Sequence, residues 1–316
     1  GVTCPEEYGG QGLVYLSYIL VVEELARIDG CQAATVAAEN SLGIGPIYNF
    51  GNKAQKEKYL PPLCTGKKLW GFGLTEPGAG SDAQNSRTKA ELKNGKWVIN
   101  GAKIFITNAA NPMTAGVTVQ CITGSRDGGK KELSCIIVPT GTAGFTARAM
   151  KNKMTWRSSN TAELYFDNVT VPEENMLGQR GDGFRQMMQT LDSGRLSIAA
   201  MGLGGAQGAF EEALKYSKER RAFGQSISSF QVNAFKLADC AMEIEAARNL
   251  LYKACWLKDS DRPFTKEAAM AKLYTSEVFH RAANHCVQLH GGYGLMEEYP
   301  AAKYYRDQKL LEIGEG

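Results

Sequence analysis

The stretch from Leu74 to Asp82, Leu-Thr-Glu-Pro-Gly-Ala-Gly-Ser-Asp, combines the residue types of a ligand-binding loop. It follows a hydrophobic run, Trp70–Leu74, that is typical of a strand. Pro77 fixes one φ angle, whereas Gly78 and Gly80 permit positive φ angles and close backbone approach. The loop can therefore offer backbone amides and hydroxyl groups to a polar ligand. An ordinary surface turn has the same composition, so the loop by itself leaves both interpretations open.

Charged side chains elsewhere have the residue types that catalysis or phosphate binding requires. Glu315 stands between two glycines, where a carboxylate could remove a proton from a ligand or could simply be exposed at a chain end. Arg220, within Glu219-Arg-Arg-Ala-Phe-Gly224, offers a rigid fork of donors that suits phosphate oxygens, although a solvated charge cluster has the same sequence. Asp192 and Arg195 are three residues apart and can form a local ion pair on one helix.

The histidines and cysteines do not have the spacing of metal ligands. His280, His285 and His290 are spaced by five, so they do not share one helical face. The eight cysteines are scattered without a Cys-x-x-Cys pair, which is typical of a reducing compartment and of small buried apolar residues. The sequence therefore predicts no metal site.

Composition places the chain among globular proteins. Its 316 residues, 43% hydrophobic and 22% charged, can bury a large core, and the length suggests two or three domains. The net charge of +3 comes from interleaved signs, which predicts no nucleic-acid or membrane patch. The apolar run Leu13–Val22 is too short to span a bilayer. The chain opens with Gly1 rather than Met and stops at Gly316 after an acidic motif, so we expect a longer protein at both ends.

The elements that must position these residues are indicated by two changes of hydrophobic period. From Leu13 to about Leu63 the spacing is helical, with a break expected at Pro61-Pro62. Residues 70–172 alternate like strands, and Asn94-Gly95 and Asn100-Gly101 predict two hairpin turns. Strands are expected at residues 70–74, 87–92, 96–99, 102–107, 115–123, 133–138, 145–149 and 163–171.

From residue 183 onward the spacing is helical again. Helices are expected at residues 183–219, 229–258, 266–289 and 301–311. In the third, apolar residues at three- and four-residue steps predict one continuous buried stripe, made of Ala271, Tyr274, Val278, Ala282, Cys286 and Leu289. Together these segments predict a helical bundle.

The order of helices, strands and bundle, together with four motifs, resembles the acyl-CoA dehydrogenase family over essentially the whole chain. The motifs are Thr75-Glu-Pro-Gly-Ala-Gly-Ser-Asp82, Asn100-Gly-Ala-Lys-Ile-Phe-Ile-Thr-Asn108, Glu219-Arg-Arg-Ala-Phe-Gly224 and Gln288-Leu-His-Gly-Gly292. Short-chain (butyryl-CoA) members are most similar. The resemblance implies an α+β fold with an N-terminal all-α domain (1–69), a middle antiparallel β-barrel-like domain (70–172) and a C-terminal four-helix bundle (173–316), the first and last incomplete.

The resemblance implies a non-covalent FAD site. Thr75 and Thr107 would hydrogen-bond the isoalloxazine edge, and Phe105 would lie over the ring, where many relatives carry Trp; Phe keeps the π face but lacks the indole donor. Arg220 matches a pyrophosphate contact that reaches the flavin of a neighbouring subunit, which implies a homo-oligomer, with a tetramer expected. The cofactor-binding residues carried over are Phe72, Leu74, Thr75, Gly80, Ser81, Phe105, Ile106, Thr107, Arg220, Phe223, Gln231, Gln288, Leu289, Gly291 and Gly292.

The resemblance also implies the reaction. Glu315 would take the α proton of a short- or medium-chain acyl-CoA while the β hydrogen leaves as hydride to flavin N5, giving a trans-2-enoyl-CoA. Gly314 stands where Tyr is common in the family, so the acyl specificity stays open. The family's other position for the base is Gly194 here, which has no side chain. The substrate-binding residues carried over are Ser81, Asp192, Arg195 and Gly316.

The partner and the compartment follow from the same resemblance. Electrons would pass to an electron-transfer flavoprotein, in fatty acid β-oxidation, in a bacterial cytoplasm or a mitochondrial matrix. An acyl-CoA oxidase, an enzyme working in the enoyl-CoA reductase direction, and a non-catalytic acyl-CoA or flavin-binding module share the same scaffold and stay open. A flavin monooxygenase would lack the base, so Glu315 argues against it.

Overall fold

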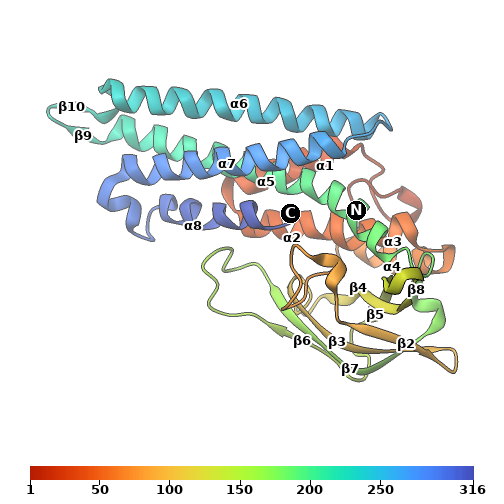
Figure 1. Cartoon of the computed structure of the whole chain (residues 1–316). Helices are drawn as coiled ribbons and strands as arrows, with labels where there is room; N and C mark the ends of the chain where they lie inside the picture. Colours follow the sequence, from red (N-terminus) through yellow and green to blue (C-terminus); the bar gives the residue numbers. More distant parts are fainter. The chain divides into compact units, whose positions relative to one another are not determined.

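The structure, a computed structural model, describes all residues from Gly1 to Gly316 (Figure 1). The chain forms two compact units, which are described separately. The first unit comprises residues 1–13, 35–152 and 158–191, and the second comprises residues 14–34, 153–157 and 192–316. Helices α2 (Gly30–Ala38) and α5 (Gly183–Glu219) each begin in one unit and end in the other.

Short helices precede the sheet of the first unit: η1 (Glu6–Tyr8), η2 (Glu39–Ile44), α3 (Gly45–Phe50) and α4 (Lys53–Cys64). Helix α4 begins with a capping box in which Asn52 and Gln55 bond each other's backbone N–H. The expected break at Pro61-Pro62 is wrong, because α4 continues through both prolines. They lie in its last turn, so their missing N–H groups remove only the final hydrogen bonds of the helix.

The sheet of the first unit has eight strands: β1 (Leu69–Gly73), β2 (Lys89–Lys93), β3 (Lys96–Thr107), β4 (Thr114–Ser125), β5 (Lys131–Pro139), β6 (Phe145–Ala149), β7 (Thr161–Pro172) and β8 (Met176–Leu177). Their order is β6-β7-β3-β2-β4-β5-β8, with β1 paired to β4. The predicted β domain is confirmed, and most neighbouring strands are antiparallel. Strand β4, however, pairs in parallel with both β1 and β2.

The two Asn-Gly steps have different roles. Asn94 and Gly95 adopt φ angles of 51° and 71° and close the β2–β3 hairpin, as predicted. The turn predicted at Asn100-Gly101 is wrong, because β3 runs through it with a shift of register against β7. A Cβ at Gly101 would lie 2.6 Å from Thr88 Oγ1, so a close approach of the chain requires this glycine, and the strand bulges there.

Strand β1 is fixed in the core, and this fixes the start of the candidate ligand loop. All five of its residues are buried. The backbone N–H of Trp70 donates to Glu39 Oε2 at 2.8 Å, and its indole N–H donates to Thr118 Oγ1 at 2.9 Å. The Trp70 ring packs against Tyr59 of α4, with ring centres 5.1 Å apart. The loop therefore leaves from a strand that has little freedom to move.

The second unit is a helical bundle made of α1 (Tyr15–Ile28), most of α5, α6 (Gln231–Asp259), α7 (Thr265–His290) and α8 (Pro300–Ile313), with η6 (Ile227–Ser229) and η7 (Gly291–Leu295) between helices. All four helix ranges predicted from residue 183 onward agree to within two residues. In the predicted stripe of α7 only Tyr274 is half-buried, and the others are buried. No helix combines the length and hydropathy that crossing a bilayer requires.

A short hairpin separates α5 from α6 at one end of the bundle (Figure 1). It consists of β9 (Arg221–Ala222) and β10 (Gln225–Ser226), joined by a two-residue turn in which Phe223 and Gly224 have φ angles of 51° and 81°. Two positive φ angles are the mark of a tight hairpin turn. Phe223, at the tip of the hairpin, is 95% exposed, so a large aromatic side chain lies in solvent.

Candidate active site

The candidate ligand loop of the first unit is open to solvent on its rim. Gly78, Gly80 and Ser81 are exposed, while Thr75 is half-buried. Neither Gly78 nor Gly80 adopts the left-handed region that glycine permits. A Cβ at either position would meet nothing within 4 Å, so the glycines leave the backbone uncovered rather than bend it. Such a rim permits the close approach of a flat or anionic ligand.

A bulge in β3 presents Phe105 to solvent beside this loop. The register of β3 against β7 shifts between Lys103 and Ile106, and Phe105 has a φ angle of 61° and a side chain that is 62% exposed. A bulky residue in the left-handed region is strained, and strain of this kind gathers at functional positions. The N–H of Ile104 donates to Thr75 O at 2.9 Å, so the bulge and the loop are joined.

The other cofactor residues predicted in the first unit divide into two groups. Thr107 ends β3 as a half-buried residue, two positions beyond Phe105, and its contact with a ligand stays a prediction. Phe72, Leu74 and Ile106 instead have side chains in the core. Any contact between these three residues and a ligand would therefore come from their backbone groups.

A cavity of about 550 Å³ lies in the second unit, where α5 and α7 end. Four of the predicted cofactor residues line it: Arg220, Leu289, Gly291 and Gly292. The other five lining residues were not predicted: Tyr216, Ile227, His290, Tyr293 and Met296. Phe223, Gln231 and Gln288 are exposed but do not line it. The aromatic residues missed from the sequence are spaced as ordinary core residues, and nothing in their pattern distinguishes them.

The chemistry of this cavity fits an aromatic, anionic ligand such as a nucleotide. The guanidinium of Arg220 lies 5.7 Å from the centre of the Tyr293 ring, and no carboxylate pairs with it. His290 stacks on Tyr216 with ring centres 4.0 Å apart, and its buried Nε2 has no hydrogen-bond partner. Gly291 has a φ angle of 60° and ends α7 as the predicted cap, with open space where a Cβ would lie.

Glu315 follows α8 in the second unit, and its carboxylate has no partner. The residue is half-buried and has a φ angle of 57°, a strained conformation for a non-glycine residue. Its Oε2 atom is buried without a hydrogen bond. Burial raises the pKa of Glu315 to about 8, although the neighbouring cations Lys272 and Arg195 act to lower it. A carboxylate with a raised pKa and no internal partner is typical of a general base in a ligand-binding site.

The two cations hold the backbone around Glu315 and leave its carboxylate free. Lys272 Nζ donates to Gly316 O at 2.6 Å and to Glu312 O at 3.3 Å. Arg195 Nε donates to Glu315 O at 3.3 Å. The tail is therefore tied on both sides of the carboxylate, which fixes its position without neutralising it by a direct ion pair.

The local ion pair that the spacing of Asp192 and Arg195 permits is present, with Nη1 to Oδ1 at 2.7 Å, and their carried-over contact with the substrate stays a prediction. The other oxygen of Asp192 accepts from Thr265 Oγ1 at 2.9 Å. Because both carboxylate oxygens have internal partners, Asp192 orients Arg195 in the structure. Gly316, the last of the predicted substrate residues, is exposed beside the same arginine.

Gly194 and Glu315 occupy complementary space. A Cβ at residue 194 would overlap Glu315 Oε2 and lie 2.8 Å from its Cδ. The absence of a side chain on this turn of α5 is therefore what admits the carboxylate. A side chain at residue 194 and the carboxylate of Glu315 therefore cannot occupy these positions together, and the role of Glu315 as the base stays a prediction.

A cavity of about 610 Å³ in the first unit, with three basic residues in its lining, was not predicted. One of its lining residues, Asp82, directly follows Ser81 in the chain. It is lined by Asp82, Gln84, Asn85, Arg126, Gly129, Lys130, Lys131, Leu133, Gly181 and Phe184. Lys131 is held by Asn85 Oδ1 at 2.8 Å and Ser86 O at 2.9 Å, whereas Lys130 is exposed. The run Arg126-Asp-Gly-Gly-Lys-Lys131 could have indicated a phosphate-binding turn, since glycines and cations gather in it.

Family models match almost the whole chain. They describe the acyl-CoA dehydrogenase N-terminal domain (residues 1–67), middle domain (residues 71–169) and C-terminal domain (residues 181–316).

Individual relatives agree with these matches. The short-chain specific acyl-CoA dehydrogenase of Megasphaera elsdenii is 47% identical, over 100% of this chain and 83% of the relative. The butyryl-CoA dehydrogenase structure from Megasphaera elsdenii has a TM-score of 0.96 at 46% identity, covering 100% of this chain and 83% of that one. A chain in the structure of the electron transferring flavoprotein of Acidaminococcus fermentans also has a TM-score of 0.96 at 46% identity, covering 100% and 82%.

Proposed function

Because the chain belongs to the acyl-CoA dehydrogenase family, we propose that it oxidises a short- or medium-chain acyl-CoA to the trans-2-enoyl-CoA, with Glu315 as the base. The protein is an acyl-CoA dehydrogenase, a flavoprotein oxidoreductase of fatty acid metabolism that uses FAD. The observation that carries the proposed role of Glu315 is its buried, unpartnered Oε2, in a place that only a glycine at residue 194 leaves open.

Each unit, taken by itself, has residues that suit a part of FAD. In the first unit, Thr75, Thr107 and the exposed ring of Phe105 would bind the isoalloxazine. In the second unit, the cavity lined by Arg220 and His290 would hold the nucleotide part. The guanidinium of Arg220, which has no carboxylate partner, suits a pyrophosphate. The buried Nε2 of His290 lies 3.9 Å from Glu212 Oε1 and makes no hydrogen bond, so it can take a polar partner from a ligand. We propose that this cavity serves the flavin of another subunit, so that the enzyme is a homo-oligomer, with a tetramer expected.

Glu315 would remove the α proton of the thioester. Burial raises its pKa to about 8, which is close to neutral pH, where a general base works best, and the deprotonated form is the active one. FAD, when bound, supplies the acceptor for the β hydrogen, which leaves as hydride. The cations Lys272 and Arg195 keep the tail in place, so the carboxylate does not have to be ordered at the moment of proton transfer.

The coenzyme A part carries phosphate groups, and the basic cavity of the first unit suits them. Arg126, Lys130 and Lys131 line it, and it starts next to Ser81, the predicted contact of the thioester arm. Cations and glycine amides are the usual ligands of phosphate oxygens. We propose that this cavity binds the nucleotide phosphates of coenzyme A.

The physiological acceptor is proposed to be an electron-transfer flavoprotein, because one chain of very similar structure belongs to a structure of that name. Relatives with these sequences occur in bacteria and in mitochondria. A bacterial cytoplasm or a mitochondrial matrix is the compartment that we propose. The short acyl chain rests on the similarity to short-chain specific and butyryl-CoA enzymes.

The test is anaerobic reduction of the purified flavoprotein by butyryl-CoA and octanoyl-CoA, followed at the flavin absorption bands. Wild-type enzyme should bleach with at least one of them, and Glu315→Gln should bleach at least ~10³-fold more slowly while it still binds FAD and acyl-CoA. Bleaching of the variant within about tenfold of wild type would exclude Glu315 as the base. Rapid reoxidation of the reduced enzyme by air would identify an oxidase instead of a dehydrogenase.

A further inference from the structure

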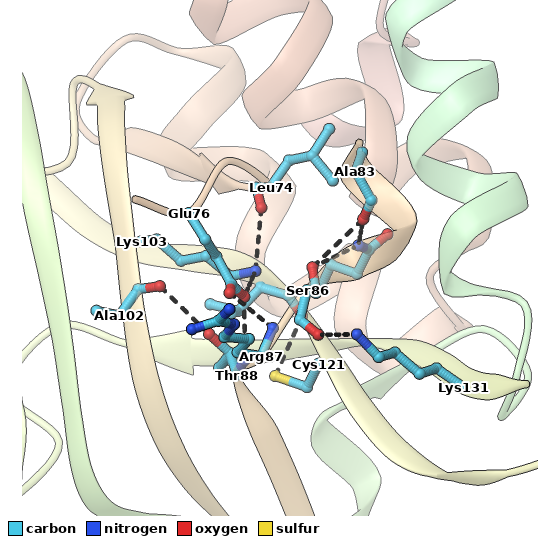
Figure 2. Close-up of polar contacts among 12 residues, drawn as sticks. Leu74, Glu76, Ala83, Ser86, Arg87, Thr88, Ala102, Lys103, Cys121 and Lys131 are labelled. Atoms are coloured by element: carbon cyan, nitrogen blue, oxygen red, sulfur yellow. Dashed lines mark hydrogen bonds and ion pairs between the residues drawn. The ribbon is translucent and has the colours of Figure 1, made fainter. Parts of the chain in front are cut away.

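We propose that Lys103 is a positioning residue for FAD, and that its buried ion pair with Glu76 holds Thr75 at a fixed place beside the bulge of β3. The inference rests on the flavin site proposed above and extends it to two residues that do not reach solvent. Figure 2 shows the contacts of Lys103 and Glu76. Lys103 has a side chain that is 0% exposed, and Glu76 has one that is 5% exposed.

Lys103 binds the residues on both sides of Thr75. Its Nζ donates to Leu74 O at 3.0 Å and to Glu76 Oε1 at 2.8 Å. The next residue of β3, Ile104, donates its N–H to the carbonyl oxygen of Thr75 itself. Three successive residues of the loop are therefore attached to two successive residues of β3, directly before the bulge that presents Phe105.

Glu76 connects this arrangement to a third segment. Its Oε2 accepts from the N–H of Arg87 at 2.7 Å, and its Oε1 accepts from the N–H of Thr88 at 3.0 Å (Figure 2). Burial by itself would raise the pKa of Glu76, but Lys103 and these amides together hold it below its usual value. The carboxylate thus stays charged and joins the loop, β3 and the segment before β2.

The far end of the loop is anchored separately from behind. Gln120, a fully buried residue of β4, donates to Ala83 O at 2.9 Å and to Ser86 Oγ at 3.0 Å. Between the two anchors the rim carries only backbone bonds: Glu76 and Ala79 bond each other, and Asp82 O accepts from the N–H of Asn85. The rim therefore reaches a ligand while both of its ends are fixed, and Lys103 fixes the end that holds Thr75.

Stability alone does not explain a buried ion pair here. Replacing such a pair by apolar or neutral groups of similar volume is often neutral or stabilising, whereas removing one partner leaves a costly buried charge. The same sheet holds a matched pair that is only a surface contact: Lys93 and Glu91, at 2.6 Å, are 61% and 62% exposed. A buried pair that ties the flanks of a candidate flavin contact is better explained by the geometry that it imposes.

The test uses four variants of the whole protein: Lys103→Met, Glu76→Gln, the double variant, and Lys93→Met as the control. FAD is removed, and two quantities are measured: the melting temperature of the apoprotein and the dissociation constant of added FAD. The double variant leaves no unpaired buried charge, although the amide that Glu76→Gln introduces faces a backbone N–H and Leu74 O loses its donor. If the pair is only structural, the double variant should recover most of the melting temperature and the full FAD affinity. If the pair positions FAD, the double variant should recover most of the melting temperature yet bind FAD about tenfold more weakly, the equivalent of one lost hydrogen bond.

Two further readouts keep the result independent of folding. Bound FAD in the double variant should show altered visible circular dichroism, and the Ile104 amide should exchange its hydrogen faster than in Lys93→Met. FAD affinity of the double variant within about threefold of wild type would overturn the proposal. Since no acyl-CoA is present, that outcome would leave Glu315 untouched, and failure of the Glu315→Gln experiment would in turn leave Lys103 untouched.

Discussion

The close approach of Gly194 to Glu315 predicts that one added methyl group impairs catalysis without unfolding the protein. In Gly194→Ala the new Cβ would lie 2.8 Å from Glu315 Cδ, and carbon atoms prefer about 3.5–4 Å, so the carboxylate must move by on the order of 1 Å. Misplacing a reacting group by that distance costs on the order of 10²-fold in rate. Alanine in place of glycine favours a helix by about 1 kcal/mol, which offsets part of the steric strain in α5.

Stopped-flow reduction of bound FAD by butyryl-CoA measures the rate, and thermal melting measures the stability. We expect Gly194→Ala to be about 10²-fold slower, with little change in melting temperature. Glu315→Asp is the matched control, because its shorter side chain leaves room for the methyl group. The double variant Gly194→Ala/Glu315→Asp should therefore reduce its flavin less than about threefold more slowly than Glu315→Asp alone. A single Gly194→Ala variant as fast as wild type would refute the steric argument and the position of the base.

Three further predictions concern the charged residues. The rate of flavin reduction should increase as pH rises through about 8, where Glu315 loses its proton. Lys272→Met should shift this increase to higher pH, because Lys272 lowers the pKa of Glu315. A pH profile unchanged by the substitution would contradict Glu315 as the titrating base. Arg220→Ala should weaken FAD binding by about 2 kcal/mol, measured by titration of the apoprotein, and a monomer that keeps tight FAD would oppose the shared site. Lys130→Met should raise the KM for butyryl-CoA several-fold but leave the KM for butyryl-pantetheine unchanged, and an equal effect on both would remove the phosphate role.

The large elements could be predicted because their patterns are long and regular. The range 183–219 was obtained without error, since apolar residues recur at helical spacing up to the charged run that begins at Lys215. The strand Phe145–Ala149 was likewise recovered in full. In the candidate site, the motif residues Thr75 and Arg220 lie where a ligand can meet them, but whether they bind FAD stays a prediction.

Local exceptions could not be predicted, since each depends on a neighbour far along the chain. The sequence Asn100-Gly101 predicts a turn, but Gly101 lies close to Thr88 and the strand forms a bulge there. Lys103 and Glu76 lie inside two recognised motifs, yet a sequence gives a lysine no sign of complete burial. His290 and Tyr216 stack on each other only after α5 and α7 have packed together. Periodicity specifies an element, whereas such contacts require the packed fold.

The shared space of residues 194 and 315 also restricts how this sequence can vary over generations. A residue larger than glycine at 194 becomes tolerable only once the carboxylate at 315 has gone or has become shorter. Loss of that carboxylate first removes the base, and enlargement of residue 194 first displaces it. Neither order of single substitutions passes through a fully active intermediate. Sequences descended from this one should therefore keep Gly194 and Glu315 together or lose them together, even though 121 positions separate them in the chain.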